Sequence, residues 1–188
     1  MKRTAQNHVT GHPLFWLVLF ARFAAAGYIL IDPLWGFVAT IAFDYVDALT
    51  WMHMLGMRRK LYYQIDKPMD WVSYIAMYAV AIQQGFSLVL TPFLVYRLVG
   101  QVIFMTTGKQ KYFVLFPNFF EVVFFWYILG NRLGADLWSQ QFLGLLAGLL
   151  VLKLIQEFLL YYVWPWYLHH RGYPWILRLL GQTKKVRW

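Results

Sequence analysis

The sequence predicts an all-α protein, an integral membrane bundle of six transmembrane helices in which residues 1–188 form a single domain. The first observation is composition: 61% of the 188 residues are apolar, 13% are charged, and the mean hydropathy is +0.49. A soluble domain is roughly 45–50% apolar and about 25% charged. The second observation is that six apolar stretches approach the roughly 20 residues needed to cross a hydrocarbon core about 30 Å thick.

The six predicted helices cover about residues 13–31, 34–56, 66–84, 86–107, 112–130 and 137–163. Helix breakers such as Asp32-Pro33 and Gly108-Lys109 separate them. The first apolar stretch follows a short basic segment and has no small-x-small cleavage site, so we expect it to be a retained helix and not a signal peptide. The absence of cysteine excludes disulfides and thiol chemistry.

The positions of lysine and arginine predict the orientation. In a six-helix arrangement one side carries Lys2, Arg3, Arg58, Arg59, Lys60, Lys67, Lys109, Lys111, Arg171, Arg178, Lys184, Lys185 and Arg187, and the other side carries Arg132. The positive-inside rule therefore predicts that both termini are cytoplasmic, with residues 166–188 forming a basic cytoplasmic tail. The net charge of +9 also favours anionic lipid headgroups. No nucleic-acid partner is expected, because no basic stretch is interleaved with aromatic residues on a soluble module.

Four of the eight acidic residues lie close together in the sequence. Asp44 and Asp47 are three residues apart, and Asp66 and Asp70 are four apart, so each pair occupies one face of its helix. The two helices are antiparallel neighbours joined near Met57, and the two pairs lie at matching distances from that turn. All four carboxylates are therefore expected to converge. Carboxylates are costly in lipid, which makes this quartet a candidate functional site.

Other ionisable or amide side chains within the predicted helices lie at a similar depth, on the order of 10–18 Å from the cytoplasmic ends at 1.5 Å per residue. They are Arg22, Arg97, Asn118, Glu121, Lys153 and Glu157. Together with the quartet they predict a polar chamber that opens to the cytoplasm. Six acids face three bases, so about three negative charges are unmatched. Two divalent cations with hard oxygen ligands, such as Mg²⁺, Mn²⁺ or Ca²⁺, would cover this deficit.

The aspartates resemble the signature of the CDP-alcohol phosphotransferase family, D-x-x-D-G-x-x-A-R followed by G-x-x-x-D-x-x-x-D across helices two and three of a six-helix bundle. The chain reads Asp44-Tyr-Val-Asp47-Ala48-Leu-Thr-Trp51-Met52 and then, after nine residues, Tyr62-Tyr-Gln-Ile-Asp66-Lys-Pro-Met-Asp70. All four aspartates and their spacing agree. Ala48, Trp51, Met52 and Tyr62 stand where the family has glycine, alanine, arginine and glycine.

The resemblance implies an enzyme of phospholipid biosynthesis. Such an enzyme transfers a substituted phosphate group from a CDP-linked donor, such as CDP-diacylglycerol, to an alcohol. Asp44, Asp47, Asp66 and Asp70 would hold two Mg²⁺ or Mn²⁺ ions. Asp70 would also be the catalytic general base for the acceptor hydroxyl.

The resemblance also suggests binding residues. Ala48 would lie near the nucleotide, Trp51 and Met52 would reshape the nucleotide pocket, and the loop of Arg58, Arg59 and Lys60 would replace the family's arginine. Depth in the membrane suggests acceptor-binding roles for other residues. Arg22 and Arg97 would bind a phosphate of the acceptor, and Asn118 and Glu121 would orient its hydroxyls.

Three alternatives stay open. The first is a non-catalytic relative that keeps the metal site and has lost nucleotide chemistry, which the departures at Ala48, Trp51, Met52 and Tyr62 favour. The second is a small cation-coupled membrane carrier, although no inverted repeat is present and the polar residues stop half way across. The third concerns Lys153 and Glu157, whose i, i+4 spacing also fits a structural ion pair. A homodimer is left open as well.

Overall fold

The computed structural model describes residues 9–108 and 112–163, and the predicted tail at 166–188 lies outside this range. The described residues are helical and contain no strand, which confirms the all-α prediction. The elements are α2 (Pro13–Tyr28), α3 (Pro33–Asp47), the π-helix η1 (Ala48–Met54), α4 (Arg59–Gln83), α5 (Ser87–Thr107), α6 (Tyr112–Leu115), α7 (Phe119–Leu133), α8 (Gln140–Phe158) and the π-helix η2 (Leu159–Val163).

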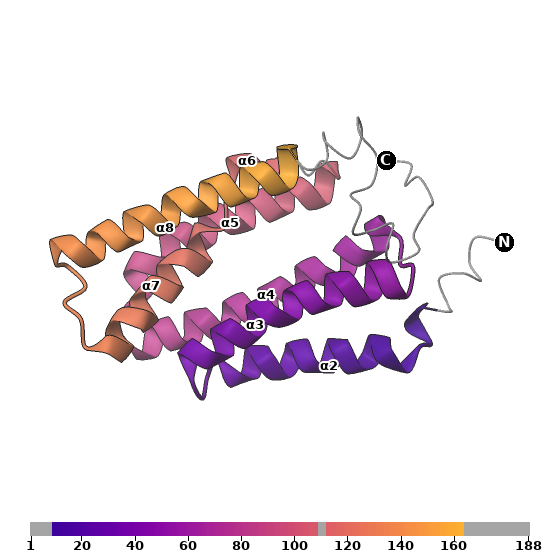
Figure 1. Cartoon of the computed structure of the whole chain (residues 1–188), viewed down its shortest axis with the longest axis horizontal. Coiled ribbons are helices and arrows are strands. Elements are labelled where there is room, and N and C mark those ends of the chain that lie inside the picture. The colour runs from indigo at the N-terminus through magenta and orange to yellow at the C-terminus, as the bar shows by residue number, and fades with distance from the viewer. Residues whose placement is uncertain (1–8, 109–111, 164–188) are drawn as a thin grey trace.

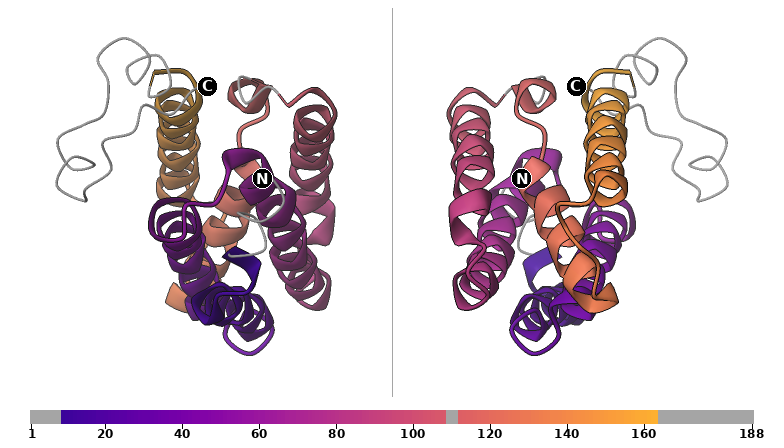
Figure 2. Two further views of the ribbon diagram at one scale, coloured as in Figure 1. Left: turned by 90° about the vertical axis from the view of Figure 1, so that its right-hand side faces the viewer. Right: turned by 90° about the vertical axis from the view of Figure 1, so that its left-hand side faces the viewer.

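The helices form a bundle in which consecutive long helices run in alternating directions (Figure 1). The α2–α3, α4–α5 and α7–α8 turns lie at one end, and the η1–α4 turn lies at the other. Within residues 9–108 and 112–163, two helical segments are long and apolar enough to cross a membrane, namely Ser87–Thr107 and the continuous stretch Gln140–Val163. The end-on views place α8 at the edge of the bundle (Figure 2), and only 6% of the apolar stretch of Gln140–Val163 is buried.

Two predicted helix boundaries are wrong. The third helix begins at Arg59 and not near residue 66. Its first turns are polar in sequence, but they carry Tyr62, which packs in an apolar cluster with Trp51. The fifth predicted helix, 112–130, is interrupted between α6 and α7 at Pro117. Proline has no amide hydrogen and clashes with the preceding turn of a helix. α7 restarts where the Asn118 side chain accepts a hydrogen bond from the Glu121 backbone amide at 3.4 Å.

The main apolar core lies between α4, α5 and α7, with contributions from α2 and α3. Its fully or nearly fully buried members include Ile29, Phe37, Met77, Val80, Leu90, Phe124 and Trp126. Phe86 stacks on Tyr127 with ring centroids 3.8 Å apart. A smaller cluster around Phe15, Trp51 and Tyr62 packs near the η1–α4 turn. The polar site lies between α2, α3 and α4, where Asp47 and Tyr62 adjoin this smaller cluster.

Candidate acidic site

Arg22 of α2 contacts all four aspartates of the quartet. Its Nη1 lies 2.8 Å from Asp66 Oδ1, and its Nη2 lies 3.0 Å from Asp44 Oδ1 and 3.1 Å from Asp70 Oδ1. Nη1 also pairs with Asp47 Oδ2. Arg22, Asp47 and Asp66 are almost completely buried. The predicted convergence of the aspartates is therefore observed, and Arg22, which was predicted to bind a phosphate of the acceptor, lies among them.

Local backbone structure positions the α3 pair. Asp32 caps α3 by accepting hydrogen bonds from the amides of Leu34 and Trp35, both at 3.2 Å, and Pro33 starts the helix. Immediately after Asp47 the helix widens into η1, where the Leu55 amide donates to the Thr50 carbonyl five residues back. π-helical turns are uncommon and occur frequently at functional sites.

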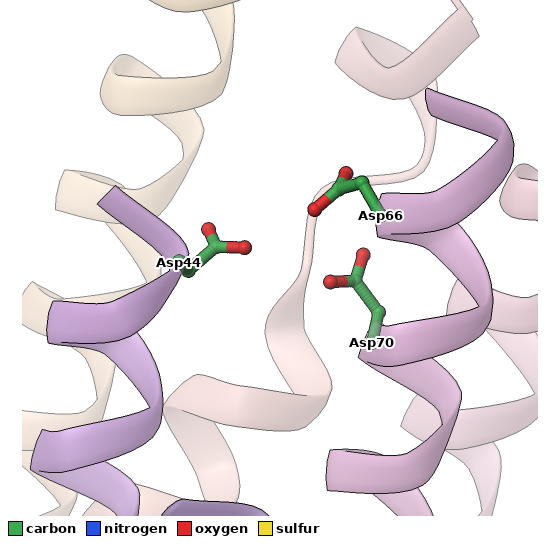
Figure 3. A group of neighbouring side chains, drawn as sticks. All are labelled: Asp44, Asp66 and Asp70. Carbon is green, nitrogen blue, oxygen red and sulfur yellow. The ribbon is translucent and has the colours of Figure 1, made fainter. Parts of the chain in front are cut away.

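Three of the four carboxylates form a compact group. Asp44 on one helix faces Asp66 and Asp70 on another (Figure 3), and one oxygen from each lies within 4.8 Å of the other two. Asp44 is the accessible member, with half of its side chain exposed. Asp47 is not part of this group; its Oδ1 accepts a hydrogen bond from the Tyr62 hydroxyl at 2.9 Å.

Lys67 belongs to the site, although the sequence analysis counted it only among the positive charges on the cytoplasmic side. Its Nζ lies 2.7 Å from Asp66 Oδ2 and 2.8 Å from Asp70 Oδ2, and the residue is only 6% exposed. The Phe113 ring lies 5.5 Å from the ammonium. Six acids therefore face four bases, and the predicted excess of three negative charges becomes two. The position of Lys67 within Asp66-x-x-x-Asp70 was the signal for this role.

A hydrogen-bond network extends from Asp70 into α5. Gln101 is fully buried, and its amide Nε2 lies 3.3 Å from Asp70 Oδ2 and 3.4 Å from the Tyr74 hydroxyl. The Trp71 indole N–H donates to Gln101 Oε1, which fixes the orientation of the amide. No sequence pattern singles out Gln101, because a single glutamine near the end of an apolar helix is common.

The Tyr74 hydroxyl joins two of the predicted acceptor residues. It accepts from Asn118 Nδ2 at 2.9 Å and from Arg97 Nε at 3.4 Å. Arg97 also donates to the Phe116 carbonyl at 2.8 Å, and its guanidinium lies over the Phe113 ring. The Arg97 and Asn118 side chains are thus hydrogen-bonded within the protein, and they stabilise the chain where the helix is interrupted before α7.

Glu157 lies next to this network. Its Oε1 is within 3.2 Å of Lys153 Nζ and 3.3 Å of the Asn118 amide nitrogen, so the ion pair expected from the i, i+4 spacing is present. Its Oε2 is buried without a hydrogen-bond partner in the described part of the chain. Glu121 lies in the first turn of α7, and no described contact links its side chain to the quartet.

The predicted nucleotide residues lie around the η1–α4 turn. Ala48 is the first residue of η1, Arg58 is exposed at the N-cap of α4, and Arg59 and Lys60 form the first turn of that helix. Trp51 is completely buried against Phe15, with ring centroids 5.0 Å apart. Trp51 is therefore a core residue of the smaller cluster, and its effect on a nucleotide pocket stays a prediction. Met52 is half-buried against the same cluster.

An apolar groove of about 350 Å³ lies between α4 and α5. It is lined by Trp71, Tyr74, Ile75, Tyr78, Ala79, Ile82, Leu94 and Leu98. Trp71 and Tyr74 also contact Gln101, so the groove adjoins the network that reaches Asp70.

Comparisons with protein-family models, with curated proteins and with solved structures each gave no match.

Proposed function

We propose that the chain is a multi-pass membrane protein in which all six long helical segments cross the bilayer and both ends are cytoplasmic. The Gln140–Val163 segment supports this proposal, because it is 24 residues long and strongly apolar, while only 6% of its apolar stretch is buried. Other segments also expose large apolar side chains, including Leu88 and Ile75 at 87% and 70%. Soluble monomers rarely expose contiguous apolar surface on this scale, whereas lipid tails would cover it favourably.

We further propose that the chain transfers a substituted phosphate group from a CDP-linked donor, such as CDP-diacylglycerol, to an alcohol. The observation that carries the proposal is the convergence of Asp44, Asp66 and Asp70. These residues come from the two segments that resemble the family's signature. The Mg²⁺ or Mn²⁺ dependence, the lipid donor and the place in phospholipid biosynthesis are parts of the same proposal.

The residues present fit a hard divalent cation. Carboxylate oxygens are the preferred ligands of Mg²⁺ and Mn²⁺, and Mg²⁺–oxygen bonds of about 2.0–2.1 Å place opposite ligands roughly 4 Å apart. One oxygen from each of the three carboxylates lies within 4.8 Å of the other two. A bound ion would replace contacts that these carboxylates make with Arg22 and Lys67. When bound, the ion would neutralise negative charge on the donor's diphosphate as a Lewis acid.

The chain's own side chains supply the remaining steps. Asp70 would accept the proton of the attacking hydroxyl, with Gln101 holding one of its oxygens from α5. Asp44 is the exposed carboxylate, so the donor's diphosphate would approach on its side. The groove beside Trp71 would hold an acyl chain of the donor within reach of the network.

A second candidate function is that of a non-catalytic protein whose charged cluster joins α2, α3 and α4. One observation favours it: Arg22 and Lys67 already pair with every carboxylate of the quartet. A buried charge network of this kind holds its members together strongly, because removing one leaves the others uncompensated.

One experiment separates the two candidates. The purified full chain in detergent is incubated with CDP-diacylglycerol, Mg²⁺ or Mn²⁺ and a panel of alcohols, and released CMP is measured. The enzyme is expected to release CMP only when metal and an acceptor are both present. Asp136→Asn, at the opposite end of the bundle, is the matched control and should behave as the wild type. Absence of CMP release together with absence of CDP-lipid binding would establish the non-catalytic candidate instead.

A further inference from the structure

We propose that a pocket beside the α2–α3 turn binds the headgroup of a zwitterionic phospholipid that carries a primary ammonium group, as phosphatidylethanolamine does. The inference rests on the proposed membrane location of the chain and not on the proposed transfer reaction. It concerns the end of the bundle opposite to the acidic site.

The pocket is a hollow of about 220 Å³. It forms where the start of α3, the end of α4 and the last turns of α7 meet, at the end of the bundle that holds the α2–α3 and α7–α8 turns (Figure 1). Its polar lining residues are Asp32, Gln84, Asn131 and Arg132. This lining suits a charged headgroup, whereas the groove between α4 and α5 is lined mainly by apolar and aromatic side chains.

A positive and a negative charge lie side by side in the pocket. Arg132 Nη1 is 3.7 Å from Asp32 Oδ2, which is too long for a hydrogen bond. Asp32 Oδ1 is occupied, because it accepts the amides of Leu34 and Trp35 at 3.2 Å. Among the residues that the structure describes, neither Asp32 Oδ2 nor the Arg132 guanidinium has a hydrogen-bond partner. Both charged groups can therefore bind a ligand without breaking an existing hydrogen bond.

Hydrogen bonds hold the walls of the pocket in place. Asn131 Nδ2 donates to Gln84 Oε1 at 3.2 Å, and the Tyr127 hydroxyl donates to the Gln84 carbonyl at 3.1 Å. These two bonds tie α7 to the end of α4. Gln84 Nε2 donates no hydrogen bond within the described part of the chain, so it is available as a second donor beside the guanidinium. Walls that are already ordered lower the entropic cost of binding.

The surroundings place the pocket at the level of lipid headgroups in the proposed topology. Trp35 adjoins the pocket, and Trp138 lies in the neighbouring α7–α8 turn; these residues are 57% and 67% exposed. Tryptophan is enriched at the interface between membrane and water. Ile31, directly before Asp32, is 80% exposed, as expected for a side chain that contacts lipid. The ligand is therefore a lipid headgroup of the non-cytoplasmic leaflet.

The two charges select the class of headgroup. The guanidinium suits a phosphate, because its N–H donors match the phosphate oxygens. Asp32 Oδ2 accepts from an N–H group, which a primary ammonium supplies and a quaternary ammonium does not. In phosphoethanolamine an ethylene linker joins phosphate to ammonium, so both groups reach adjacent partners. Phosphatidylcholine would keep only the phosphate contact as a hydrogen bond, and phosphatidylglycerol would bring no cation to Asp32.

The test is native mass spectrometry of the full chain in detergent, titrated with phosphatidylethanolamine, phosphatidylcholine and phosphatidylglycerol that carry the same acyl chains. The wild type is expected to retain one phosphatidylethanolamine, with a dissociation constant about fivefold lower than those of the other two lipids. Asp32→Asn keeps a residue that caps helices well and removes the charge, so the advantage over phosphatidylcholine should disappear. Arg132→Gln should weaken the binding of phosphatidylethanolamine and phosphatidylcholine by similar factors.

Asp136→Asn is the matched control, because Asp136 lies at the same end of the bundle outside the pocket. Its Oδ1 also accepts a backbone amide two residues ahead, that of Trp138 at 3.0 Å. This variant should keep the preference of the wild type. O-phosphoethanolamine, which has no acyl chains, serves as a competitor and should displace the lipid only at a much higher concentration. Displacement at equal concentration would make a soluble phosphate ester the ligand and would overturn the assignment to a lipid.

The remaining outcomes separate this inference from the proposed function. Equal retention of the three lipids, or a preference that survives in Asp32→Asn, overturns the inference and leaves the membrane proposal standing. A chain that retains none of the lipids contradicts both. CMP release is measured on the same preparations, and its absence together with a preference for phosphatidylethanolamine contradicts the transfer reaction alone.

Discussion

The two ends of the bundle are filled by different physical means. Toward the α2–α3 and α7–α8 turns the interior is apolar, with Phe86 stacked on Tyr127 and Trp126 buried beside them. Toward the η1–α4 turn, α2, α3 and α4 meet through charges, and Arg22 alone touches four carboxylates. Apolar packing tolerates partial losses, whereas a buried charge network depends on every partner. A chain that needed only stability would have little reason to use the second solution, which is why the proposed functional site is the one at that end.

The largest expected effect comes from removing the central charge. Arg22→Met keeps the volume of the side chain and leaves four carboxylates with one remaining cation, Lys67. Breaking a buried ion pair by removing one partner typically costs about 3–5 kcal/mol of unfolding free energy. The measurement is the unfolding midpoint of the detergent-purified protein in a denaturant titration.

Arg132→Met is the control at the other end. Arg132 lies 3.7 Å from Asp32 and its side chain is mostly exposed, so the expected change is within about 0.5 kcal/mol. Equal effects of the two substitutions would contradict the contrast between the two ends of the bundle.

The contrast also explains what the sequence can predict. The spacing of Asp44 and Asp47, and of Asp66 and Asp70, predicted their convergence, because helical geometry follows directly from residue number. The partners of these residues were not predictable in the same way. Lys67 was counted among the charges on the cytoplasmic side, and in the structure it is buried near the Phe113 ring, which is distant in sequence. No local sequence pattern predicts the change to a π-helix after Asp47 or the hydrogen bond between Gln101 and Asp70.

Asp70 distinguishes a catalytic charge cluster from a structural one. If Asp70 is the general base, Asp70→Asn should lower the rate of CMP release by a factor of about 10²–10⁴, the usual contribution of a positioned proton acceptor. Binding of CDP-diacylglycerol should be largely retained, because the amide keeps an oxygen at the site. The measurements are initial rates with saturating donor and a separate lipid-binding assay. Parallel loss of binding and rate would show that Asp70 acts in binding the donor or metal instead.

Divalent cations should stabilise the folded protein through the acidic site near the η1–α4 turn. A ligand that binds only the folded state at 100 times its dissociation constant adds about 2.7 kcal/mol of stability. Mn²⁺ is therefore expected to raise the melting temperature of the wild type, and Asp66→Asn should abolish the shift. Asp47→Asn should preserve most of the shift, because Asp47 is held by Tyr62 and Arg22 outside the group of three carboxylates. If both variants lose the response equally, Asp47 belongs to the metal site.

The smallest expected effect concerns close packing near the apolar end. A Cβ atom added at Gly36 would lie 2.3 Å from the Ile29 backbone nitrogen, whereas one at Gly27 would meet nothing within 4 Å. The Gly36 amide also donates to the Asp32 carbonyl at 2.8 Å, so the start of α3 cannot shift freely away from the end of α2. Gly36→Ala should therefore cost about 1–3 kcal/mol through overpacking. Gly27→Ala, in the last turn of α2, should be neutral or stabilise by at most about 0.5–1 kcal/mol. The unfolding midpoints of both variants, measured with and without Mn²⁺, test this pair.

A Gly36→Ala variant that also lost its response to Mn²⁺ would show that the two ends are coupled, since Gly36 and Asp44 share α3. An unchanged response would show that the apolar end sets stability and leaves the acidic site undisturbed.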